Sequence, residues 1–272
     1  MTEKPILYLI PTPIGNLDDI TVRALKTLEI VNIIFCEDTR ETKKLLKKYN
    51  IQNKLASCHE YNEEEIKEKV LYYLESGFNV GLVTDQGTPL ISDPGYKIVE
   101  YIAKSDYNIV SLPGPTAFVP ALTVSALPPQ PFLFYGFLNA KKEKQKRELE
   151  ALKNYPFTII FYEAPHRLME TLANMQEILG KRKISISREI SKKFENTYRG
   201  ELGSLPKIEL KGEFVLVVEG AKNKLDFSSL SIIEHINLYL EDGLTPNEAM
   251  KKVAQERGVA KSIIYKEYQQ KK

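Results

Sequence analysis

Charged side chains follow three predicted strands at the point where each strand ends. One group is 37–40, after the apolar residues 33–36, and two more lie within 161–167 and 187–195. Carboxylates can accept protons and guanidinium groups can hold anions, so these side chains could do chemistry. Surface ion pairs would explain any one group, but three charge-rich strand ends favour a polar cleft.

Two loops rich in glycine and proline give a second signal. Residues 84–95 follow the apolar run 80–83, and residues 113–117 follow 109–112. A helical pattern comes after each loop, so we expect both at the carboxyl ends of neighbouring parallel strands, where open α/β sheets bind ligands. Together with the loop at 11–16, such stiff backbone suits a neutral or cationic nucleoside held by main-chain groups. Well-defined turns without a ligand are the alternative.

Several common sites lack support in the sequence. No two of the 14 glycines are spaced Gly-x-Gly, and there is no Walker motif, which argues against a dinucleotide or nucleoside triphosphate enzyme. The three histidines are scattered, so we expect no metal site. Cys36 and Cys58 are too few and too far apart for a disulfide framework or a zinc site, and we predict two buried thiols.

The elements that must position these residues alternate between strand and helix. Within 1–115, the expected strands lie near 6–10, 33–36, 55–58, 80–83 and 109–112, and the helices near 19–30, 43–49, 63–75 and 95–103. This alternation implies an α/β domain with a mainly parallel sheet covered on both faces. A proline cluster at 128–131 breaks this alternation, and we predict a second domain, 116–225, with a mixed α+β sheet. Its expected strands are 132–137, 157–162, 184–187, 196–200 and 214–218, with helices near 141–153 and 165–179.

The remaining residues, 226–272, have a helical pattern only. Thr245-Pro246-Asn247-Glu248 is a capping-box start, and Gly258 is placed to end that helix. The apolar positions expected to pack are Met250, Val253 and Ala254 on this helix and Ile263, Ile264 and Tyr268 on the next. Two short helices joined by a glycine turn resemble a helix-turn-helix. It could read nucleic acid, or serve as a packing or dimerisation element.

Composition favours an ordinary soluble globular protein. Apolar residues make up 43% and charged residues 27% of the chain, and no apolar run approaches the roughly 20 residues that span a bilayer. The first residues show no secretion signal, so we expect a cytoplasmic protein without membrane partners. The net charge is only +2, but cations cluster at 141–147, 181–183 and in the last 22 residues. Such clusters could bind a polyanion. The alternative is that they form solvent-exposed helix faces without a partner.

Six segments together carry a resemblance to a known family. They are Pro11-Thr12-Pro13-Ile14-Gly15-Asn16-Leu17-Asp18-Asp19-Ile20-Thr21, Glu37-Asp38-Thr39-Arg40, Gly87-Thr88-Pro89-Leu90-Ile91-Ser92-Asp93-Pro94-Gly95, Pro113-Gly114-Pro115-Thr116-Ala117, 161–167 and Arg188-Glu189. Residues 5 to about 220 closely resemble the 16S ribosomal RNA (cytidine) ribose 2′-O-methyltransferases of the tetrapyrrole methylase superfamily. Gly87-Thr88-Pro89 stands where many superfamily members have Gly-Asp-Pro, which we interpret as marking the RNA branch.

The resemblance implies two α/β domains of the tetrapyrrole methylase type with a small helical C-terminal extension. It also implies a homodimer that holds S-adenosyl-L-methionine in the cleft between the domains and methylates a decoding-centre cytidine in 16S ribosomal RNA of the small subunit. By position, the implied cofactor contacts are Ile14, Thr88, Ile91, Thr116, Ala117, Tyr162, Glu163, Ile190 and Phe214.

Ribose methylation needs a base for the hydroxyl proton and groups that hold the RNA. The polar candidates for the base are Glu37, Asp38, Glu163 and Lys192. Those expected to bind phosphate or ribose are Arg40, His166, Arg167 and Arg188. Two alternatives stay open at this point: carbon methylation of a tetrapyrrole, which the same scaffold supports, and a non-catalytic RNA-binding module.

Overall fold

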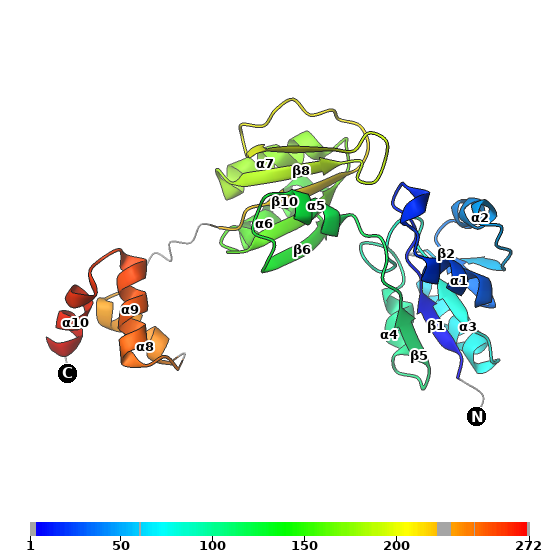
Figure 1. Cartoon of the computed structure of the whole chain (residues 1–272), viewed down its shortest axis with the longest axis horizontal. Helices are drawn as coiled ribbons and strands as arrows, with labels where there is room; N and C mark the ends of the chain where they lie inside the picture. The colour runs from blue at the N-terminus through cyan, green and yellow to red at the C-terminus, as the bar shows by residue number, and fades with distance from the viewer. Residues whose placement is uncertain (1–3, 60, 222–229, 242, 271–272) are drawn as a thin grey trace. The chain divides into compact units, whose positions relative to one another are not determined.

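The computed structural model describes residues 4–59, 61–221, 230–241 and 243–270 (Figure 1). Contacts divide the chain into two compact units. The first consists of Met1–Lys153 with Phe157–Gly220 and holds both sheets, and the second consists of Asn154–Pro156 with Ala221–Lys272. The finer division of the first unit near residue 115 stays a prediction.

The first sheet is entirely parallel, with strand order β3-β2-β4-β1-β5. Its strands are β1 (Ile6–Leu9), β2 (Ile33–Cys36), β3 (Leu55–Ser57), β4 (Val80–Leu82) and β5 (Asn108–Ser111). The expectation that β4 and β5 are neighbours was wrong, because β1 pairs with both and lies between them: Leu7 is opposite Val80 on one side and Ile109 on the other. The loop at 11–16 therefore lies between the two glycine- and proline-rich loops.

Helices cover both faces of this sheet, as predicted. Leu7 and Leu9 face a core that includes Ile66 of α3 (Glu63–Glu75) and Ile98 of α4 (Tyr96–Ile102). Ile10 faces the opposite core, with Leu28 of α1 (Val22–Ile30) and Leu46 of α2 (Thr39–Lys48). Strand side chains alternate between faces, so the sheet contributes side chains to both cores. A short 3-10 helix, η1 (Leu17–Asp19), precedes α1.

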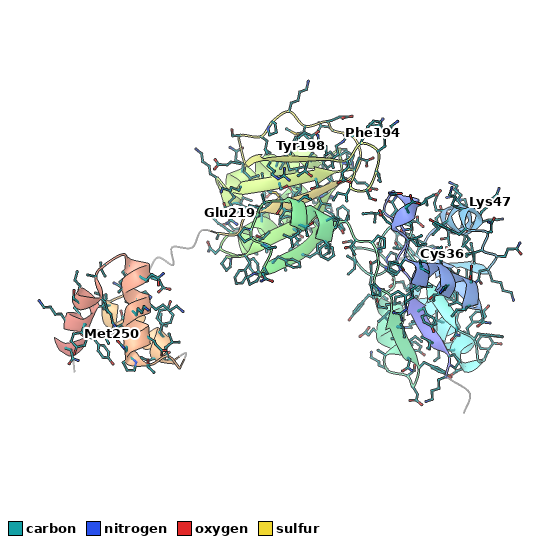
Figure 2. The ribbon with its side chains drawn as sticks, viewed as in Figure 1. Cys36, Lys47, Phe194, Tyr198, Glu219 and Met250 are labelled. Atoms are coloured by element: carbon teal, nitrogen blue, oxygen red, sulfur yellow. The ribbon has the colours of Figure 1, made fainter. Side chains whose placement is uncertain are left out.

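The prediction of two buried thiols is confirmed, because Cys36 and Cys58 are both buried and free. Cys36 lies within the first sheet (Figure 2). The largest boundary error concerns α2, which begins at Thr39 and not at residue 43. Asp38 caps this helix, since its carboxylate accepts a hydrogen bond from the backbone N–H of Arg40 at 2.8 Å.

The second sheet is mixed, as predicted, with strand order β6-β7-β10-β8-β9. Its strands are β6 (Phe132–Phe137), β7 (Thr158–Glu163), β8 (Lys183–Arg188), β9 (Asn196–Glu201) and β10 (Phe214–Val218). Only β6 and β7 run parallel, and the other pairs are antiparallel. Two helices after β6 and β7 are α6 (Lys142–Leu152) and α7 (Leu168–Leu179). A helix that the sequence pattern missed, α5 (Phe118–Val124), packs Ala121 and Leu122 against Ile160 and Val217.

The second unit contains the helices α8 (Ile232–Glu241), α9 (Pro246–Arg257) and α10 (Lys261–Gln270). The predicted capping box at Thr245 is present, and Gly258 ends α9 with φ +64°. Met250 packs in the core of this unit with Val253 and Ile264 (Figure 2). Ile263 was wrongly assigned to that core, because it is 51% exposed while its neighbour Ile264 points inward. No helix among the described residues is both long and apolar enough to span a bilayer.

Candidate active site

A cavity of about 470 Å³ lies at the carboxyl ends of the strands of the first sheet. The loops after β1, β2, β4 and β5 form one side, and residues from β7, β10 and the loop after β8 form the other. The residues that line it are Ile14, Glu37, Asp85, Gln86, Gly87, Thr88, Ile91, Ser92, Asp93, Thr116, Ala117, Phe137, Tyr162, Glu163, Ala164, Pro165, Ile190, Glu213, Phe214 and Val215. Its volume falls within the roughly 300–1,000 Å³ that is usual for small-molecule sites.

Backbone contacts hold the three neighbouring loops of the first sheet together. Thr12 and Gly87 exchange two backbone hydrogen bonds of 2.8 and 3.1 Å, which join the loops after β1 and β4. The Thr88 hydroxyl donates to the carbonyl of Pro115 at 2.9 Å, which joins the loops after β4 and β5. Gly87 has φ +88°, a conformation that glycine adopts without strain. These contacts hold the three loops together, so this side of the cavity is a preformed wall.

All nine residues predicted as cofactor contacts line this one cavity. Five of them, Ile14, Ile91, Ala117, Ile190 and Phe214, are apolar, so a flat apolar group could lie between the two sides. Tyr162 is half-buried, and burial raises the pKa of its phenol to about 12, so it stays neutral. The sequence resemblance thus selected residues that the fold brings together, although they come from four separate loops and two strands.

Three half-buried carboxyl groups meet on the first-sheet side of the cavity: Glu37, Asp85 and Asp93. Burial raises the pKa of each, and the negative charge of Asp85 adds to the effect on the other two. The pKa of Asp93 is raised to about 6. The charge pattern at the strand ends points to Glu37 but not to Asp85 and Asp93, which lie within the loop 84–95. The available signals were that Asp85 comes soon after a buried strand and that Asp93 directly precedes Pro94-Gly95.

Asp38 and Arg40 lie outside the lining of the cavity. Besides capping α2, Asp38 forms an ion pair with Arg40, with 2.6 Å between the guanidinium Nη2 and the carboxylate Oδ2. Hydrogen bonds from Arg40 lower the pKa of Asp38 to about 2. The backbone N–H of Asp38 also donates to the carboxylate of Asp85 at 3.1 Å. Asp38 is therefore a weak base, and its contacts position Asp85 and the start of α2.

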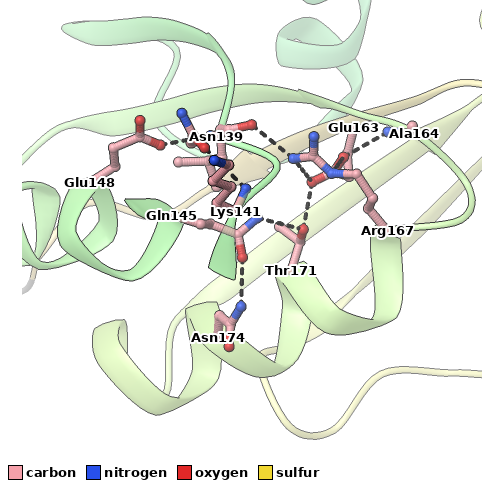
Figure 3. Close-up of polar contacts among 10 residues, drawn as sticks. Asn139, Lys141, Gln145, Glu148, Glu163, Ala164, Arg167, Thr171 and Asn174 are labelled. Atoms are coloured by element: carbon pink, nitrogen blue, oxygen red, sulfur yellow. Dashed lines mark hydrogen bonds and ion pairs between the residues drawn. The ribbon is translucent and has the colours of Figure 1, made fainter. Parts of the chain in front are cut away.

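Glu163 lines the cavity, but its carboxylate is already held by several donors (Figure 3). It accepts hydrogen bonds from the Thr171 hydroxyl at 2.5 Å and from the backbone N–H of Ala164 at 2.8 Å. Arg167 forms an ion pair with it at 3.2 Å and also donates to the carbonyl of Leu138 at 2.8 Å. Glu163 and Arg167 thus fix the end of β7, and Arg167 is not free to bind a substrate.

Lys192 and Arg188 also form structural contacts. Lys192 forms ion pairs with Glu213 at 2.8 Å and Glu189 at 3.3 Å. Burial alone would lower its pKa, but these ion pairs raise it, so Lys192 stays protonated and is a poor base. Arg188 is only 5% exposed and donates to the carbonyls of Lys211 and Phe194. His166 is exposed and does not line the cavity.

No group of three or more His, Cys, Asp or Glu side chains suited to a metal ion occurs in the part of the chain that the structure describes. The cavity instead combines apolar side chains with carboxylates. Such a site suits an organic ligand that carries positive charge, because the carboxylates complement the cation.

The chain is similar to proteins of a known family over most of its length. The family model described as Tetrapyrrole (Corrin/Porphyrin) Methylases matches residues 6–206. The "Ribosomal RNA small subunit methyltransferase I" of Bacillus subtilis (strain 168) is 48% identical over 277 residues, covering 98% of this chain and 95% of that protein. The protein of the same name from Escherichia coli O157:H7 is 39% identical, covering 96% and 93%.

Solved structures show a similar fold at low sequence identity. The methyltransferase CobJ has a TM-score of 0.60 at 18% identity, covering 80% of this chain and 95% of that one. A uroporphyrin-III C-methyltransferase from Thermus thermophilus, complexed with S-adenosyl homocysteine, has a TM-score of 0.55 at 16% identity, covering 78% and 96%. At such identities the likeness concerns the fold.

Proposed function

The chain belongs to the tetrapyrrole methylase family, and from this premise we propose that it methylates ribosomal RNA of the small subunit, with S-adenosyl-L-methionine as methyl donor. The observation that carries the proposal is the 48% identity, over nearly the whole of both chains, to a protein named as a small-subunit ribosomal RNA methyltransferase. We propose further that the acceptor is the ribose 2′-hydroxyl of a decoding-centre cytidine in 16S RNA.

The residues of the cavity fit this cofactor. Ile14, Ile91 and Phe214 offer apolar contacts for an adenine ring, and the polar lining residues Gln86 and Thr116 offer donors and acceptors for the ribose and the amino acid part. A Cβ at Gly87 would lie 3.4 Å from the Ile14 side chain, an ordinary contact, so glycine is favoured here by its φ of +88° and not by lack of space. When bound, the cofactor supplies a methyl group on a positively charged sulfur, which the nearby carboxylates would favour.

The chain's own residues must align the hydroxyl and accept its proton. In the displacement, the oxygen–methyl bond forms as the sulfur–methyl bond breaks, and the hydroxyl proton passes to a base. Among the carboxyl groups of the cavity, we propose Asp93 as this base, with Glu37 and Asp85 beside it. A pKa of about 6 leaves Asp93 ionised at neutral pH but more basic than an ordinary aspartate. Asp38, with a pKa of about 2, is less suited.

We also propose a homodimer that works in the cytoplasm. Apolar side chains are exposed on α5 and on the edge strand β6: Val119 at 48%, Val124 at 41% and Phe132 at 40%. A second copy would cover such a surface. Sedimentation velocity should give twice the mass of the chain, and a Phe132→Glu variant should shift it toward the monomer. A monomer at all concentrations would contradict the proposal.

Methyl transfer with tritiated cofactor tests the function. Purified protein is incubated with small ribosomal subunits, with naked 16S RNA and with a porphyrinoid. Label in the RNA that survives alkali as a resistant dinucleotide supports ribose methylation, because a 2′-O-methyl group blocks cleavage at that phosphate. Label in the porphyrinoid would instead indicate tetrapyrrole methylation, and label in neither would indicate binding without catalysis.

A further inference from the structure

Helix α2 has an unusually basic exposed surface. Its ten residues include five cations and a single carboxylate, Glu41. All five cations are exposed, because Thr42 and Leu46 take the buried positions four residues apart. The five are Arg40, Lys43, Lys44, Lys47 and Lys48, and Lys47 is labelled in Figure 2. A surface with this density of positive charge attracts polyanions, so we interpret it as a binding surface and not only as a solvated helix face.

The helix begins next to the candidate active site. Its cap, Asp38, follows Glu37 directly, and Glu37 lines the cavity. A hollow of about 340 Å³ runs along one side of α2 and contains Lys44 and Lys48. This hollow shares Asp85 and Gln86 with the cavity, so the two spaces adjoin at the loop after β4. A chain whose reacting group enters the cavity could therefore continue past Gln86 to these two lysines.

A second hollow, of about 780 Å³, lies along another side of the helix and includes Arg40, Lys43 and Lys47. Its lining contains neither Asp85 nor Gln86. The lysines of this second hollow serve as a comparison on the same helix. They carry the same charge as Lys44 and Lys48, but their hollow shares no lining residue with the cavity.

The charges on the cavity side are available for a ligand. Lys44 pairs with Glu41 at 2.6 Å, but both side chains are more than half exposed, so the pair is weak and can be exchanged for a phosphate. Lys48 forms no ion pair with any other residue that the structure describes. The basic helix α6 differs, because its Lys146 is paired with Glu177 at 2.7 Å. Its positive charges are also interspersed with the carboxylates of Glu143, Glu148 and Glu150.

We propose that the cavity side of α2 binds the backbone of the substrate RNA, with Lys44 and Lys48 contacting phosphates next to the nucleotide whose ribose enters the cavity. Residues four apart on a helix lie about 6 Å from each other, so the two lysines can bind separate phosphates along one strand. The ligand is a single strand of RNA, because only an unpaired nucleotide can enter the cavity. This inference rests on the proposed function, and it assigns the direction in which the RNA leaves the active site.

The test compares two double variants of the full chain. Lys44→Ala with Lys48→Ala removes the proposed contacts. The control, Lys69→Ala with Lys104→Ala, removes the same charge from exposed positions that line neither the cavity nor either hollow. Filter binding to 16S RNA at several salt concentrations, calorimetry with the cofactor and methyl transfer to small subunits are measured for both variants and for the wild type.

The Lys44 and Lys48 variant should lose at least about tenfold in RNA affinity and in kcat/KM on subunits, mainly through KM. The slope of log affinity against log salt should fall by about 1.4, since each phosphate contact on a single strand contributes about 0.7. Cofactor affinity and melting temperature should stay unchanged, and the control should match the wild type. A second variant, Lys43→Ala with Lys47→Ala, should lose less.

The outcomes separate this inference from the proposed function. If the wild type labels RNA and the Lys44 and Lys48 variant keeps wild-type affinity and salt slope, the inference is wrong and the function stands. An equal loss in the Lys43 and Lys47 variant would overturn the assignment to the cavity side. If the wild type neither binds nor labels the RNA, both proposals fail.

Discussion

Asp93 lies in the cavity wall with Glu37 and Asp85 as neighbours, and we expect it to set the pH dependence of the reaction. A base must be ionised to accept the hydroxyl proton, so kcat/KM should rise with pH through about 6 and then level off. Asp93→Asn should lower kcat about 100-fold or more and remove this rise. The measurement is single-turnover methyl transfer between pH 5 and 8 (roughly the range in which a group with this pKa titrates).

Asp106→Asn is the matched control for that variant, because Asp106 pairs with Lys4 on the surface. It should keep wild-type activity at every pH. If Asp93→Asn retains the wild-type rate and pH profile, the base is one of the other two carboxyl groups. Glu37→Gln and Asp85→Asn then distinguish them by the same measurement.

Thr116 offers a test of the cofactor position. A Thr116→Trp variant should abolish cofactor binding in calorimetry, because the indole would fill space in a cavity of about 470 Å³ whose wall includes Thr116. Thr123→Trp is the control, since Thr123 is exposed on α5 and does not line the cavity. Unchanged affinity in the Thr116 variant would place the cofactor elsewhere.

The fold brings the predicted cofactor residues together but does not do so for most of the predicted charged residues. The nine cofactor positions came from a resemblance across whole motifs, and all nine line one cavity. The charged residues were selected for their type and place in the chain, which do not reveal their partners. Arg188 and Lys192 turned out to be held by nearby carbonyls and carboxylates, and Asp93 was missed because its shifted pKa arises from burial in the folded chain.

At the scale of elements, the loops that meet at the cavity depend on backbone conformation. Gly87 has φ +88°, and Gly77 has nearly the same φ of +87° in a turn with no atom near a potential Cβ. Alanine at either position should cost about 1 to 2 kcal/mol of stability, because both would hold a strained left-handed conformation. Only Gly87→Ala should also weaken cofactor binding, since Gly87 lines the cavity.

Thermal unfolding and calorimetry on the two glycine variants separate these effects. Similar losses in melting temperature with a selective loss of cofactor affinity in Gly87→Ala would support the preformed wall. A loss of affinity of the same size in Gly77→Ala would mean that general destabilisation, and not the shape of the cavity, controls binding.

Most strands and helices could be predicted from hydrophobic periodicity, but two features of their arrangement could not. The position of β1 between β4 and β5 results from pairing between distant segments, and periodicity carries no information on strand order. Helix α5 has only seven residues and follows Pro113 and Pro115, so it is too short to give a clear helical pattern. Its stability comes from packing Ala121 and Leu122 on the second sheet, which is a tertiary effect.

In the whole molecule, the division into two units separates the cavity from the helical extension. Every residue that lines the cavity belongs to the first unit, and Met250, Val253 and Ile264 form a separate core in the second. We expect a chain that ends after Ala221 to fold and to bind the cofactor with wild-type affinity. Keeping Ala221 preserves its backbone hydrogen bond to the carbonyl of Tyr155 at 2.7 Å.

The same truncated chain shows what the basic extension contributes to RNA binding. If α8 to α10 bind nucleic acid, filter binding to 16S RNA should weaken and its salt slope should fall, while calorimetry with the cofactor is unchanged. If these helices serve packing or dimerisation, the RNA affinity per protomer should persist and sedimentation should change instead. Loss of cofactor binding in a truncated chain that still melts cooperatively would contradict the separation, because the cavity would then need the second unit.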